Sequence, residues 1–313
     1  MERLESIVEK IDAGGELLAH RPLLGGISAS MIAFDMRDSE GTIRHLVMRK
    51  AGARVLAESP EAISYEFKVL GALKESTVSS PVPVLLDESG DIFKEPYMVL
   101  EYLDGCPKYD AGNSVAQKRD YVEKMAAALA ALHALPCYGG EYDFLTVQKD
   151  RLEKKFSKRP EKLDPLLREP ELRGIIENNL PLSGLNKQVL LHGDFWPGNV
   201  LWQGAEITGI IDWEDAEMGD PLYEIAVTRF DLLWVFGRDA MEHFTETYKA
   251  LIGAEVDFGN LPYFELMSAI RPSLRISEWV DGWVDLGRDD VTEETFLKCH
   301  KYYVDRALCE LGS

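Results

Sequence analysis

The stretch from residue 190 to residue 213 reads LLHGDFWPGNVLWQGAEITGIIDW and carries the most informative pattern in this chain. Two apolar runs, each predicted to form a strand, flank a turn that contains a Pro-Gly pair. A third apolar run, residues 207–211, follows a glycine and ends at Asp212. The polar residues Asp194, Asn199 and Asp212 therefore lie where predicted strands end or turn.

These three residues supply the groups that a phosphoryl-transfer site requires. Such a site needs one carboxylate to receive or orient the attacking hydroxyl, and an amide oxygen and a second carboxylate to hold Mg²⁺. Each residue alone is typical of an ordinary turn. The combination H-x-D-x-x-x-x-N, followed after a hairpin by a strand-terminal Asp, favours the catalytic interpretation.

Two segments carry a resemblance to a known family. Residues 192–199 (HGDFWPGN), and residues 211–216 (IDWEDA) with the following Gly-Asp-Pro, resemble the signature of the aminoglycoside phosphotransferase family, relatives of choline and fructosamine kinases. The resemblance is strongest over residues 190–227 and extends more loosely over almost the whole chain. It implies a protein-kinase-like fold of two lobes.

The resemblance also implies roles for individual residues. Asp194 corresponds to the catalytic base, and Asn199 and Asp212 correspond to the magnesium ligands. His192 and Glu224 correspond to residues that support the catalytic loop without taking part in the chemistry.

The pattern of apolar residues changes near residue 103. Residues 1–103 are predicted to form a small α+β nucleotide-binding lobe of five antiparallel strands and one helix, with a hinge at its end. Residues 104–313 are predicted to form a larger, mainly α lobe with the catalytic loop and the substrate site. The strands of the small lobe are expected at Pro22–Gly26, Ser30–Met36, Ile43–Lys50, Val82–Asp87 and Tyr97–Leu103, and its helix at Pro60–Lys74.

A nucleotide site in the small lobe requires a cation and a carboxylate that holds it. Arg49, near the end of the third predicted strand, matches the position of a basic residue in similar family members, and Lys50 is the alternative. Because side chains alternate along a strand, only one of the two can face the cleft. Glu66 resembles the glutamate that pairs with this cation, although an exposed helix acid would have the same sequence context.

Two further segments are candidates for nucleotide contacts. The small residues between the first two strands would let backbone amides and the hydroxyls of Ser28 and Ser30 approach phosphate oxygens. The run Tyr97–Gly105 resembles the hinge that pairs with adenine, and Glu101 and Leu103 are the expected backbone positions. An ordinary hairpin and an ordinary buried strand would read similarly.

Composition excludes several classes of partner. The chain has 313 residues and a net charge of −20, which repels nucleic acids and anionic membranes. Its four cysteines form no C-x-x-C pair, and no apolar run is long enough to span a bilayer. We therefore expect a cytoplasmic protein, monomeric or homodimeric, with reduced thiols and no nucleic-acid or membrane partner.

The predicted reaction is the transfer of a γ-phosphate from ATP or GTP, with Mg²⁺, to the hydroxyl of a small molecule. Glu214, Asp215, Glu217 and Asp220 would make the cleft negative and favour a cationic or aminated sugar acceptor such as an aminoglycoside, although half of them could be turn residues. Trp279, Asp281, Trp283 and Asp285 could line a cation-binding wall, or the tryptophans could belong to the core.

Two other functions stay open on the sequence. A non-catalytic nucleotide-binding or scaffold protein would keep the fold and lose a metal ligand, whereas Asp194, Asn199 and Asp212 are all present. A protein kinase would need an A-P-E-like sequence and a long activation segment, and neither lies between Asp212 and Asp220.

Overall fold

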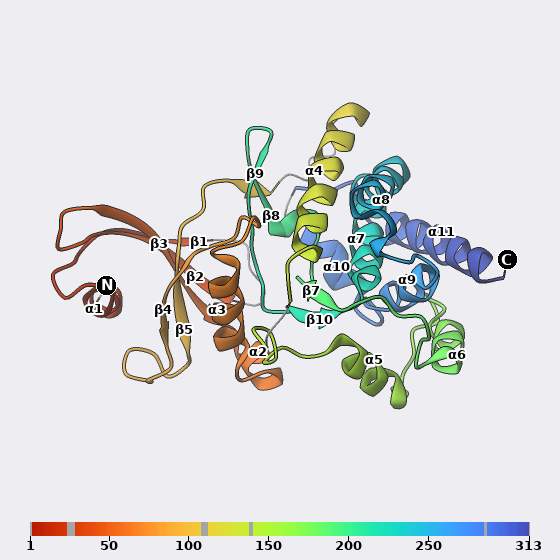
Figure 1. The fold of residues 1–313 in the computed structure, drawn as a ribbon, viewed down its shortest axis with the longest axis horizontal. Coiled ribbons are helices and arrows are strands. Elements are labelled where there is room, and N and C mark those ends of the chain that lie inside the picture. Colours follow the sequence, from red (N-terminus) through yellow and green to blue (C-terminus); the bar gives the residue numbers. More distant parts are fainter. Residues whose placement is uncertain (1, 24–28, 108–111, 138–139, 285–286, 313) are drawn as a thin grey trace. The chain divides into compact units, whose positions relative to one another are not determined.

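The computed structural model describes most of the chain, and Figure 1 labels its elements. The chain divides into two compact units, which are treated separately below. The first unit comprises Met1–Cys106 and Leu201–Glu214, and the second comprises Pro107–Val200 and Asp215–Ser313. The described residues are 2–23, 29–107, 112–137, 140–284 and 287–312.

A five-stranded antiparallel sheet forms the body of the first unit, in the order β1-β2-β3-β5-β4. Its outer strand β1 is mostly exposed and contains an irregularity between Leu17 and Ala19, so its sequence lacks a clear apolar alternation. This explains why β1 begins six residues before the predicted strand at Pro22. The strands are β1 (Glu16–Leu23), β2 (Ala29–Arg37), β3 (Ile43–Ala51), β4 (Pro83–Asp87) and β5 (Tyr97–Glu101).

One face of this sheet is covered by the amphipathic helix α1 (Glu2–Ile11). Acidic residues in its first turn and a lysine in its last turn complement the helix dipole. Alternate residues of three strands point to this helix, as expected from the two-residue period of a strand. The shared core consists of Leu4, Ile7, Val8, Phe34, Met36, Leu46, Met48, Tyr97 and Val99.

The other face of the sheet receives helix α3 (Ala62–Leu73), which follows the short helix α2 (Ala53–Glu58). The buried stripe of α3 includes Ile63, Leu70 and Leu73 at helical spacing. Glu66 lies within this apolar stripe and is 2% exposed. The structure therefore rules out the alternative that Glu66 is an exposed helix acid.

A three-stranded layer in the order β6-β8-β9 brings the segment after residue 200 to the first unit. Strand β9 ends two residues before Asp212, and the backbone amide of Ile210 donates to the carbonyl of Ser79. Asp212 is thereby tied to the same unit as the large sheet. The strands are β6 (Cys106–Pro107), β8 (Val200–Gln203) and β9 (Glu206–Ile210).

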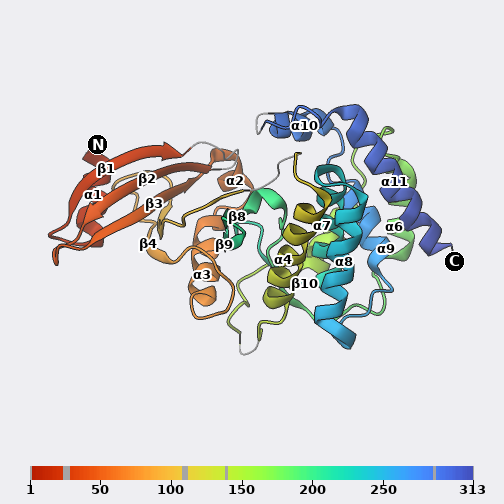
Figure 2. The same ribbon diagram turned by 90° about the horizontal axis from the view of Figure 1, so that it is seen from above.

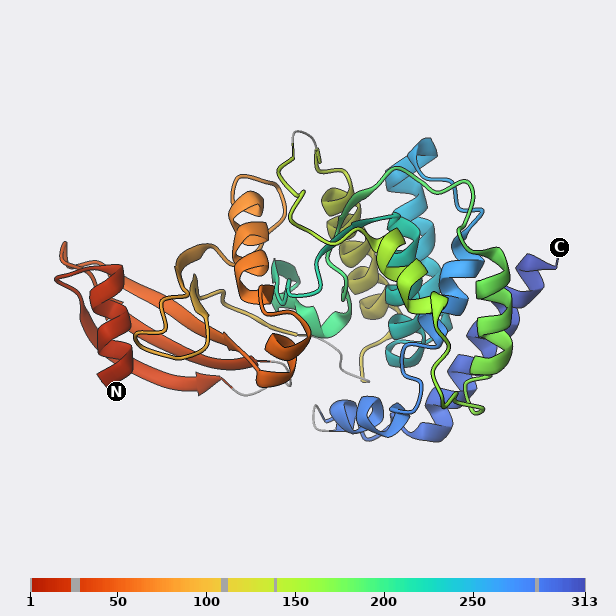
Figure 3. The ribbon, with the colours of Figure 1, turned by 90° about the horizontal axis from the view of Figure 1, so that it is seen from below.

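The second unit is mainly helical, and Figure 2 shows α4, α7 and α8 side by side. Figure 3 shows α10 leading toward the long C-terminal helix α11. All fifteen residues of α7 are buried, which makes this helix the centre of the unit. The helices are α4 (Val115–His133), α5 (Gln148–Ser157), α6 (Glu169–Asn179), α7 (Pro221–Val235), α8 (Arg238–Ile252), α9 (Leu261–Ala269), α10 (Ile276–Val284) and α11 (Glu293–Leu311).

A short two-stranded ladder in this unit carries the catalytic motif. Strand β7 (Val189–Leu191) pairs with β10 (Glu217–Gly219), and a turn of 3-10 helix (Pro197–Asn199) follows β7. The order of strand, loop and strand predicted from the sequence motif is therefore present, with the loop between β7 and β8.

The antiparallel sheet of five strands and the helical second unit confirm the predicted α+β class. The helix expected at Pro60–Lys74 is α3, and the first unit adds α1 and α2 to it. Within the described ranges, no helix combines the length and the apolar character that crossing a bilayer requires.

Candidate active site

Arg49 is the centre of a buried charged cluster in the first unit. Its Nε donates to Glu66 at 2.9 Å, and its Nη2 donates to Asp212 at 2.6 Å and to Glu214 at 2.8 Å. The Arg49 side chain is 6% exposed and that of Asp212 is 31% exposed. The structure therefore brings together three predicted site residues, Arg49, Glu66 and Asp212, and adds Glu214 to them.

The electrostatics of this cluster keep Arg49 charged. Burial disfavours the charged guanidinium, but the carboxylates of Glu66, Asp212 and Glu214 outweigh burial and raise the pKa of Arg49. Burial raises the pKa of Glu66, an effect that its ion pair with Arg49 opposes.

Lys50 lies on the opposite face of the sheet. It follows Arg49 along β3, so its side chain points to the face that α1 covers, where its Nζ is 5.3 Å from the ring centre of Phe93 and 3.4 Å from Glu95. Lys50 contacts none of the residues in the Arg49 cluster, among those whose interactions the structure describes. Of the two candidates for a phosphate-contacting cation, the structure groups Arg49 with Glu66.

The hinge candidates lie at the end of β5. The amide of Glu101 donates to the carbonyl of Val82, and the amide of Tyr102 donates to the carbonyl of His45, so both amides are used by the sheet. The side chain of Glu101 pairs with Arg44 at 2.5 Å. Leu103 packs close to Gly209, where an added Cβ would lie 2.4 Å from the Leu103 Cδ1.

The phosphate-covering turn is only partly described. Ser30 is an exposed residue of β2 opposite Lys50. Ser28 lies outside the described residues, as does the run of small residues before it.

In the second unit, Asp194 projects from the loop that follows β7. Asn199 Nδ2 donates to the backbone carbonyl of Asp194 at 2.9 Å and approaches its Oδ2 at 3.4 Å. The Asp194 side chain is 33% exposed, whereas Asn199 is 6% exposed. A partly exposed carboxylate on a loop braced by a buried amide is an arrangement that can receive a proton from a substrate hydroxyl.

Glu224 anchors this loop by accepting hydrogen bonds from two of its backbone amides. Its Oε1 accepts from the amide of Gly193 at 2.7 Å, and its Oε2 accepts from the amide of His192 at 3.1 Å. His133 Nε2 lies 2.9 Å from the same Oε2, and Tyr248 holds the other ring nitrogen of His133 at 2.8 Å. Glu224 therefore supports the loop as the resemblance implied, whereas no sequence motif pointed to the contacts of His133 and Tyr248 with it.

Two backbone conformations mark the site as specialised. Gly193 has φ +86°, and a Cβ there would lie 2.0 Å from the carbonyl oxygen of Asp215, so a side chain is excluded. Asp212 has φ +69°, a region that few residues other than glycine adopt. Such strain at a polar residue is typical of functional positions.

The predicted magnesium ligands have suitable chemistry. Since Asn199 uses its Nδ2 for Asp194, the amide group can offer Oδ1 to a cation, and Asp212 offers a carboxylate. Oxygen ligands of this kind are those that Mg²⁺ prefers. The two residues belong to different units, Asn199 to the second and Asp212 to the first.

Arg271 is a site residue that the sequence did not reveal. It follows the C-terminal end of α9, and its Nη2 donates to Asp194 Oδ1 at 3.0 Å. Nearby, burial raises the pKa of Asp231 to about 7, an effect that Arg271 opposes and Asp194 reinforces. Neither residue belongs to a sequence motif. Helix packing brings both of them near the loop.

The acidic residues after Asp212 prove to be largely structural. Glu217 is buried and accepts two hydrogen bonds from Arg151, each at 2.6 Å. Asp220 caps α7 through the amide of Leu222 at 2.9 Å, and Glu214 pairs with Arg49. Three of the four carboxylates expected to make the cleft negative are therefore compensated or used as caps.

The tryptophans of α10 are also explained by packing. Trp283 is 4% exposed and meets Trp234 edge to face at 5.4 Å. Trp279 stacks on Trp234 and lies 5.7 Å from the guanidinium carbon of Arg271. The cation held by this aromatic surface is thus a side chain of the protein itself. Asp285 lies outside the described residues.

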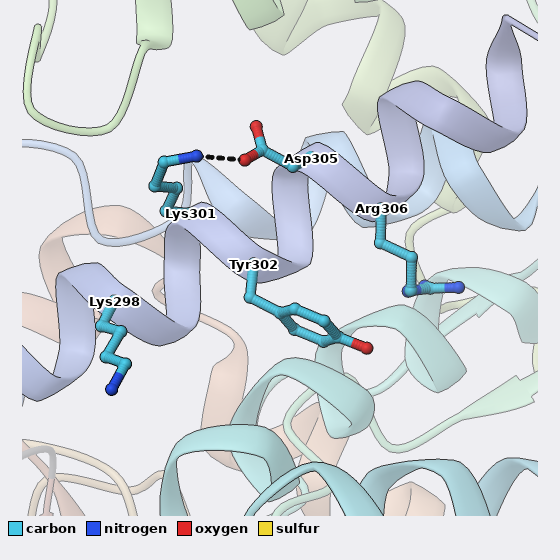
Figure 4. Close-up of a pocket in the computed structure, with 5 residues that line it drawn as sticks. All are labelled: Lys298, Lys301, Tyr302, Asp305 and Arg306. Atoms are coloured by element: carbon cyan, nitrogen blue, oxygen red, sulfur yellow. Dashed lines mark hydrogen bonds and ion pairs between the residues drawn. The ribbon is translucent and has the colours of Figure 1, made fainter.

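A hollow of about 460 Å³ lies on the surface of α11 (Figure 4). Its lining comes from one helix, and Lys301 and Asp305 pair with each other within it. The lining residues are Lys298, Lys301, Tyr302, Asp305 and Arg306. None of the predicted site residues contributes to it.

Comparison by sequence identifies relatives of this chain. The model of the phosphotransferase enzyme family matches residues 20–261. Acyl-CoA dehydrogenase family member 10 of Mus musculus is 28% identical over 197 residues, which cover 58% of this chain and 18% of the mouse protein. Hygromycin-B 4-O-kinase of Escherichia coli is 44% identical over 46 residues, covering 15% of this chain and 14% of the kinase.

The relatives named for acyl-CoA dehydrogenase are much longer proteins. Member 11 of Homo sapiens is 26% identical over 204 residues, which cover 61% of this chain and 26% of the human protein. The chain therefore spans about a fifth to a quarter of the length of these relatives.

Solved structures share the fold along nearly the whole chain. The GDP complex of wild-type aminoglycoside 2'-phosphotransferase-IIIa matches with a TM-score of 0.64 and 19% identity, covering 97% of this chain and 98% of its own. Macrolide 2'-phosphotransferase MphH of Brachybacterium faecium matches with a TM-score of 0.61 and 18% identity, covering 95% and 97%. The predicted kinase-like fold is thereby confirmed.

Proposed function

Because the chain belongs to the phosphotransferase enzyme family, we propose that it transfers the γ-phosphoryl group of ATP or GTP to a hydroxyl group of a small molecule. The observation that carries this proposal is the partial exposure of the Asp194 carboxylate on a loop that other residues support. Asn199 and the contacts of Glu224 hold this loop in place. A preorganised carboxylate of this kind suits the orientation and deprotonation of an attacking hydroxyl.

In the proposed reaction, the acceptor oxygen forms a bond to the γ-phosphorus as the bond between that phosphorus and the bridging oxygen of the nucleoside diphosphate breaks. Asp194 receives the hydroxyl proton, and the nucleoside diphosphate leaves with the bonding electron pair. Mg²⁺ bound by Asn199 and Asp212 would neutralise charge on the phosphates.

Arg49 and Glu66 are proposed to act on the nucleotide. Arg49 is a permanently charged donor, and Glu66 fixes its guanidinium from the buried stripe of α3. The backbone of Glu101 and Leu103 is proposed to contact the base. The hydroxyls of Ser28 and Ser30 are proposed to approach the phosphates, and Lys50 stays the alternative to Arg49 as the cation.

Related structures support a nucleotide co-substrate and a small acceptor. One neighbour was solved with GDP and kanamycin, and another with ATP and streptomycin. Their identity to this chain is 18% in both cases, so the acceptor of this protein must be inferred from its own residues.

The direct test is Mg²⁺-dependent turnover of ATP and GTP with a panel of hydroxylated acceptors, comparing the wild type with Asp194→Asn. We expect kcat to fall by about 10²-fold or more, because the variant cannot accept the proton. Asp150→Asn, an exposed aspartate of α5, is the matched control and should leave kcat unchanged.

Two results would contradict the proposal. Equal turnover by wild type and Asp194→Asn would remove Asp194 from the chemistry. A wild type that binds nucleotide but transfers phosphate to no acceptor in the panel would favour the alternative of a non-catalytic nucleotide-binding protein.

A further inference from the structure

The residue closest to the proposed base is a cation. Arg271 Nη2 donates to Asp194 Oδ1 at 3.0 Å, and the two side chains are 21% and 33% exposed. Both residues belong to the second unit, and both side chains are partly exposed to solvent. An acceptor whose hydroxyl lies at Asp194 would also meet Arg271.

Arg271 is held in place and remains charged. Its guanidinium carbon lies 5.7 Å from the ring centre of Trp279, within the range of a cation–π contact. Burial disfavours its charge, but Asp194, Tyr223 and Asp231 outweigh burial and raise its pKa. The cation is therefore permanent and has a fixed position.

The Arg271 guanidinium has more N–H donors than acceptors for them in the described part of the chain. A guanidinium carries five N–H groups, and Asp194 is the one acceptor found for Arg271 in the described part of the chain. No nitrogen of Arg271 is among the buried polar atoms that lack a partner, and its side chain is partly exposed, so its remaining donors are not fully buried. Such donors suit the paired oxygens of a carboxylate or a phosphate.

A second cation strengthens the positive character of this region. The pKa of Lys155 is lowered to about 8 by burial and by the charges of Arg151, Arg271 and Arg173. Arg151 pairs with Glu217 and Arg173 pairs with Glu169, but no carboxylate pairs with Lys155 within the described ranges. Lys155 is thus a second side chain that senses the charge of Arg271, and Glu169 offsets part of the effect of these cations on it.

The same region presents an aromatic surface. Trp196, two residues after Asp194, meets Trp283 at 5.1 Å, and Trp283 connects through Trp234 to Trp279. Trp234 and Trp283 are buried, whereas Trp196 and Trp279 are partly exposed. One indole ring therefore lies against Arg271, and Trp196 follows Asp194 on the same loop.

We propose that the acceptor is a hydroxylated organic anion with an apolar body. Its anionic group binds the free N–H donors of Arg271, its apolar body packs on Trp196 and Trp279, and its hydroxyl lies at Asp194. This inference rests on the proposed phosphotransfer and narrows its substrate class. The product is the phosphate ester of the anion, and the hydroxyl proton passes to Asp194 as the nucleoside diphosphate leaves.

The test uses three matched acceptors on one carbon skeleton. The first is a series of hydroxyoctanoates that differ in the position of the hydroxyl, the second is their neutral methyl esters, and the third is the amino alcohols in which an ammonium group replaces the carboxylate. Phosphorylation with MgATP gives kcat/KM for each, and quenching of tryptophan fluorescence measures binding without turnover. We expect the carboxylates to bind and react best and the ammonium compounds worst.

Arg271→Gln and Arg271→Lys separate anion recognition from a general effect on Asp194. Arg271→Gln should reduce the preference for carboxylate over ester by about 10- to 100-fold, the effect of losing a charge-assisted hydrogen bond. Arg271→Lys should restore part of this preference. Arg275→Gln, an exposed arginine four residues later, is the matched control and should leave it unchanged.

The outcomes distinguish this inference from the proposed function. Preference for the ammonium compounds, or a carboxylate preference that Arg271→Gln leaves intact, would overturn the inference, as would failure of every hydroxyoctanoate to bind while another class of acceptor is phosphorylated. Binding of hydroxyoctanoates that depends on Arg271, without phosphate transfer to any acceptor, would support the inference and contradict the proposed phosphotransfer.

Discussion

Arg49 and Glu66 form an ion pair in which both side chains are at most 6% exposed. Removing one partner of such a pair leaves an uncompensated buried charge, which destabilises a protein by about 3–5 kcal/mol. We therefore expect Arg49→Met to lower the free energy of unfolding by that amount, and Glu66→Leu to lower it by less, because Arg49 keeps its pairs with Asp212 and Glu214. The double variant should recover part of the loss relative to Arg49→Met, because it also removes the buried Glu66 carboxylate, whereas the more exposed Asp212 and Glu214 still lose their partner.

Urea unfolding measures the stability of all three variants, and thermal protection by MgATP measures nucleotide binding. We expect the double variant to be stable and yet unprotected, since Arg49 is absent. Full protection of the double variant by MgATP would show that Arg49 serves the fold and not the nucleotide.

Asp231 gives a prediction about pH. Burial raises its pKa from 3.8 to about 7, so the folded protein holds an extra proton between these two values. The free energy of unfolding therefore falls as pH rises through this window and stays lowered above it. Asp231→Asn removes this effect and keeps an oxygen for Trp234 Nε1.

We expect Asp231→Asn to raise Tm relative to the wild type, and to raise it more at pH 8 than at pH 5, by about 2–4 °C per kcal/mol recovered. Differential scanning fluorimetry at the two pH values checks this, with Asp150→Asn as the control that should show no pH-dependent difference. An equal change in Tm at both pH values would mean that Asp231 is ionised throughout.

Single residues also show how far the sequence could be used. Alternation along β3 predicted that Arg49 and Lys50 point to opposite faces, and the structure shows which face carries Glu66. Asp194, Asn199 and Asp212 were found by their spacing along one segment. Arg271 and Asp231 could not be found in this way, because they reach the loop from α7 and from the end of α9 through tertiary packing.

At the scale of elements, the loop between β7 and β8 depends on Gly193. Its φ of +86° and the carbonyl oxygen of Asp215 both exclude a side chain, whereas Gly204 has φ +61° and no atom within 4 Å of an added Cβ. Left-handed strain alone destabilises by about 1–2 kcal/mol. Gly204→Ala should show that effect, and Gly193→Ala should show a larger one.

The two variants should also differ in activity. Gly193→Ala must displace the segment that carries Asp194, so we expect it to lower kcat strongly even in the fraction that folds, whereas Gly204→Ala should retain kcat. Steady-state kinetics at a temperature where both variants are folded provides the measurement. Normal kcat in Gly193→Ala would show that the loop does not require its present geometry.

The helices and strands themselves differed in how well the sequence predicted them. Buried strands such as β3 and β5 were placed to within two residues, because their apolar runs are distinct. The exposed edge strand β1 and the short helix α2 were not predicted at their full extent, since pairing and packing, and not local pattern, define them.

At the scale of the whole molecule, the division into two units predicts two separate patterns of protection. Arg49, Glu66 and Asp212 belong to the first unit, and Asp194, Arg271 and the tryptophans belong to the second. MgATP alone should slow amide exchange in β3, α3 and residues 201–214. A hydroxylated anion alone should slow exchange around residues 194–199 and 270–284.

Hydrogen exchange measured by mass spectrometry with each ligand separately and with neither gives the comparison. Protection by MgATP confined to the second unit would contradict the assignment of the nucleotide to the Arg49 cluster. Protection by the anion confined to the first unit would contradict the acceptor site at Arg271.

The sequence by itself predicted the fold class of this protein and the reaction class that we propose for it. A catalytic motif is a set of polar residues at fixed spacing on one short segment, and strand and helix patterns are local, so both can be recognised without a structure. Only the tertiary structure shows which carboxylates pair with arginines or cap a helix, and which cation lies beside the proposed base. Glu217 pairs with Arg151, and Asp220 caps α7. Arg271 lies 77 residues from Asp194 in the chain and donates a hydrogen bond to it. Charge compensation depends on neighbours in space, and for that reason the acidic sequence alone could not show which charges lie beside Asp194.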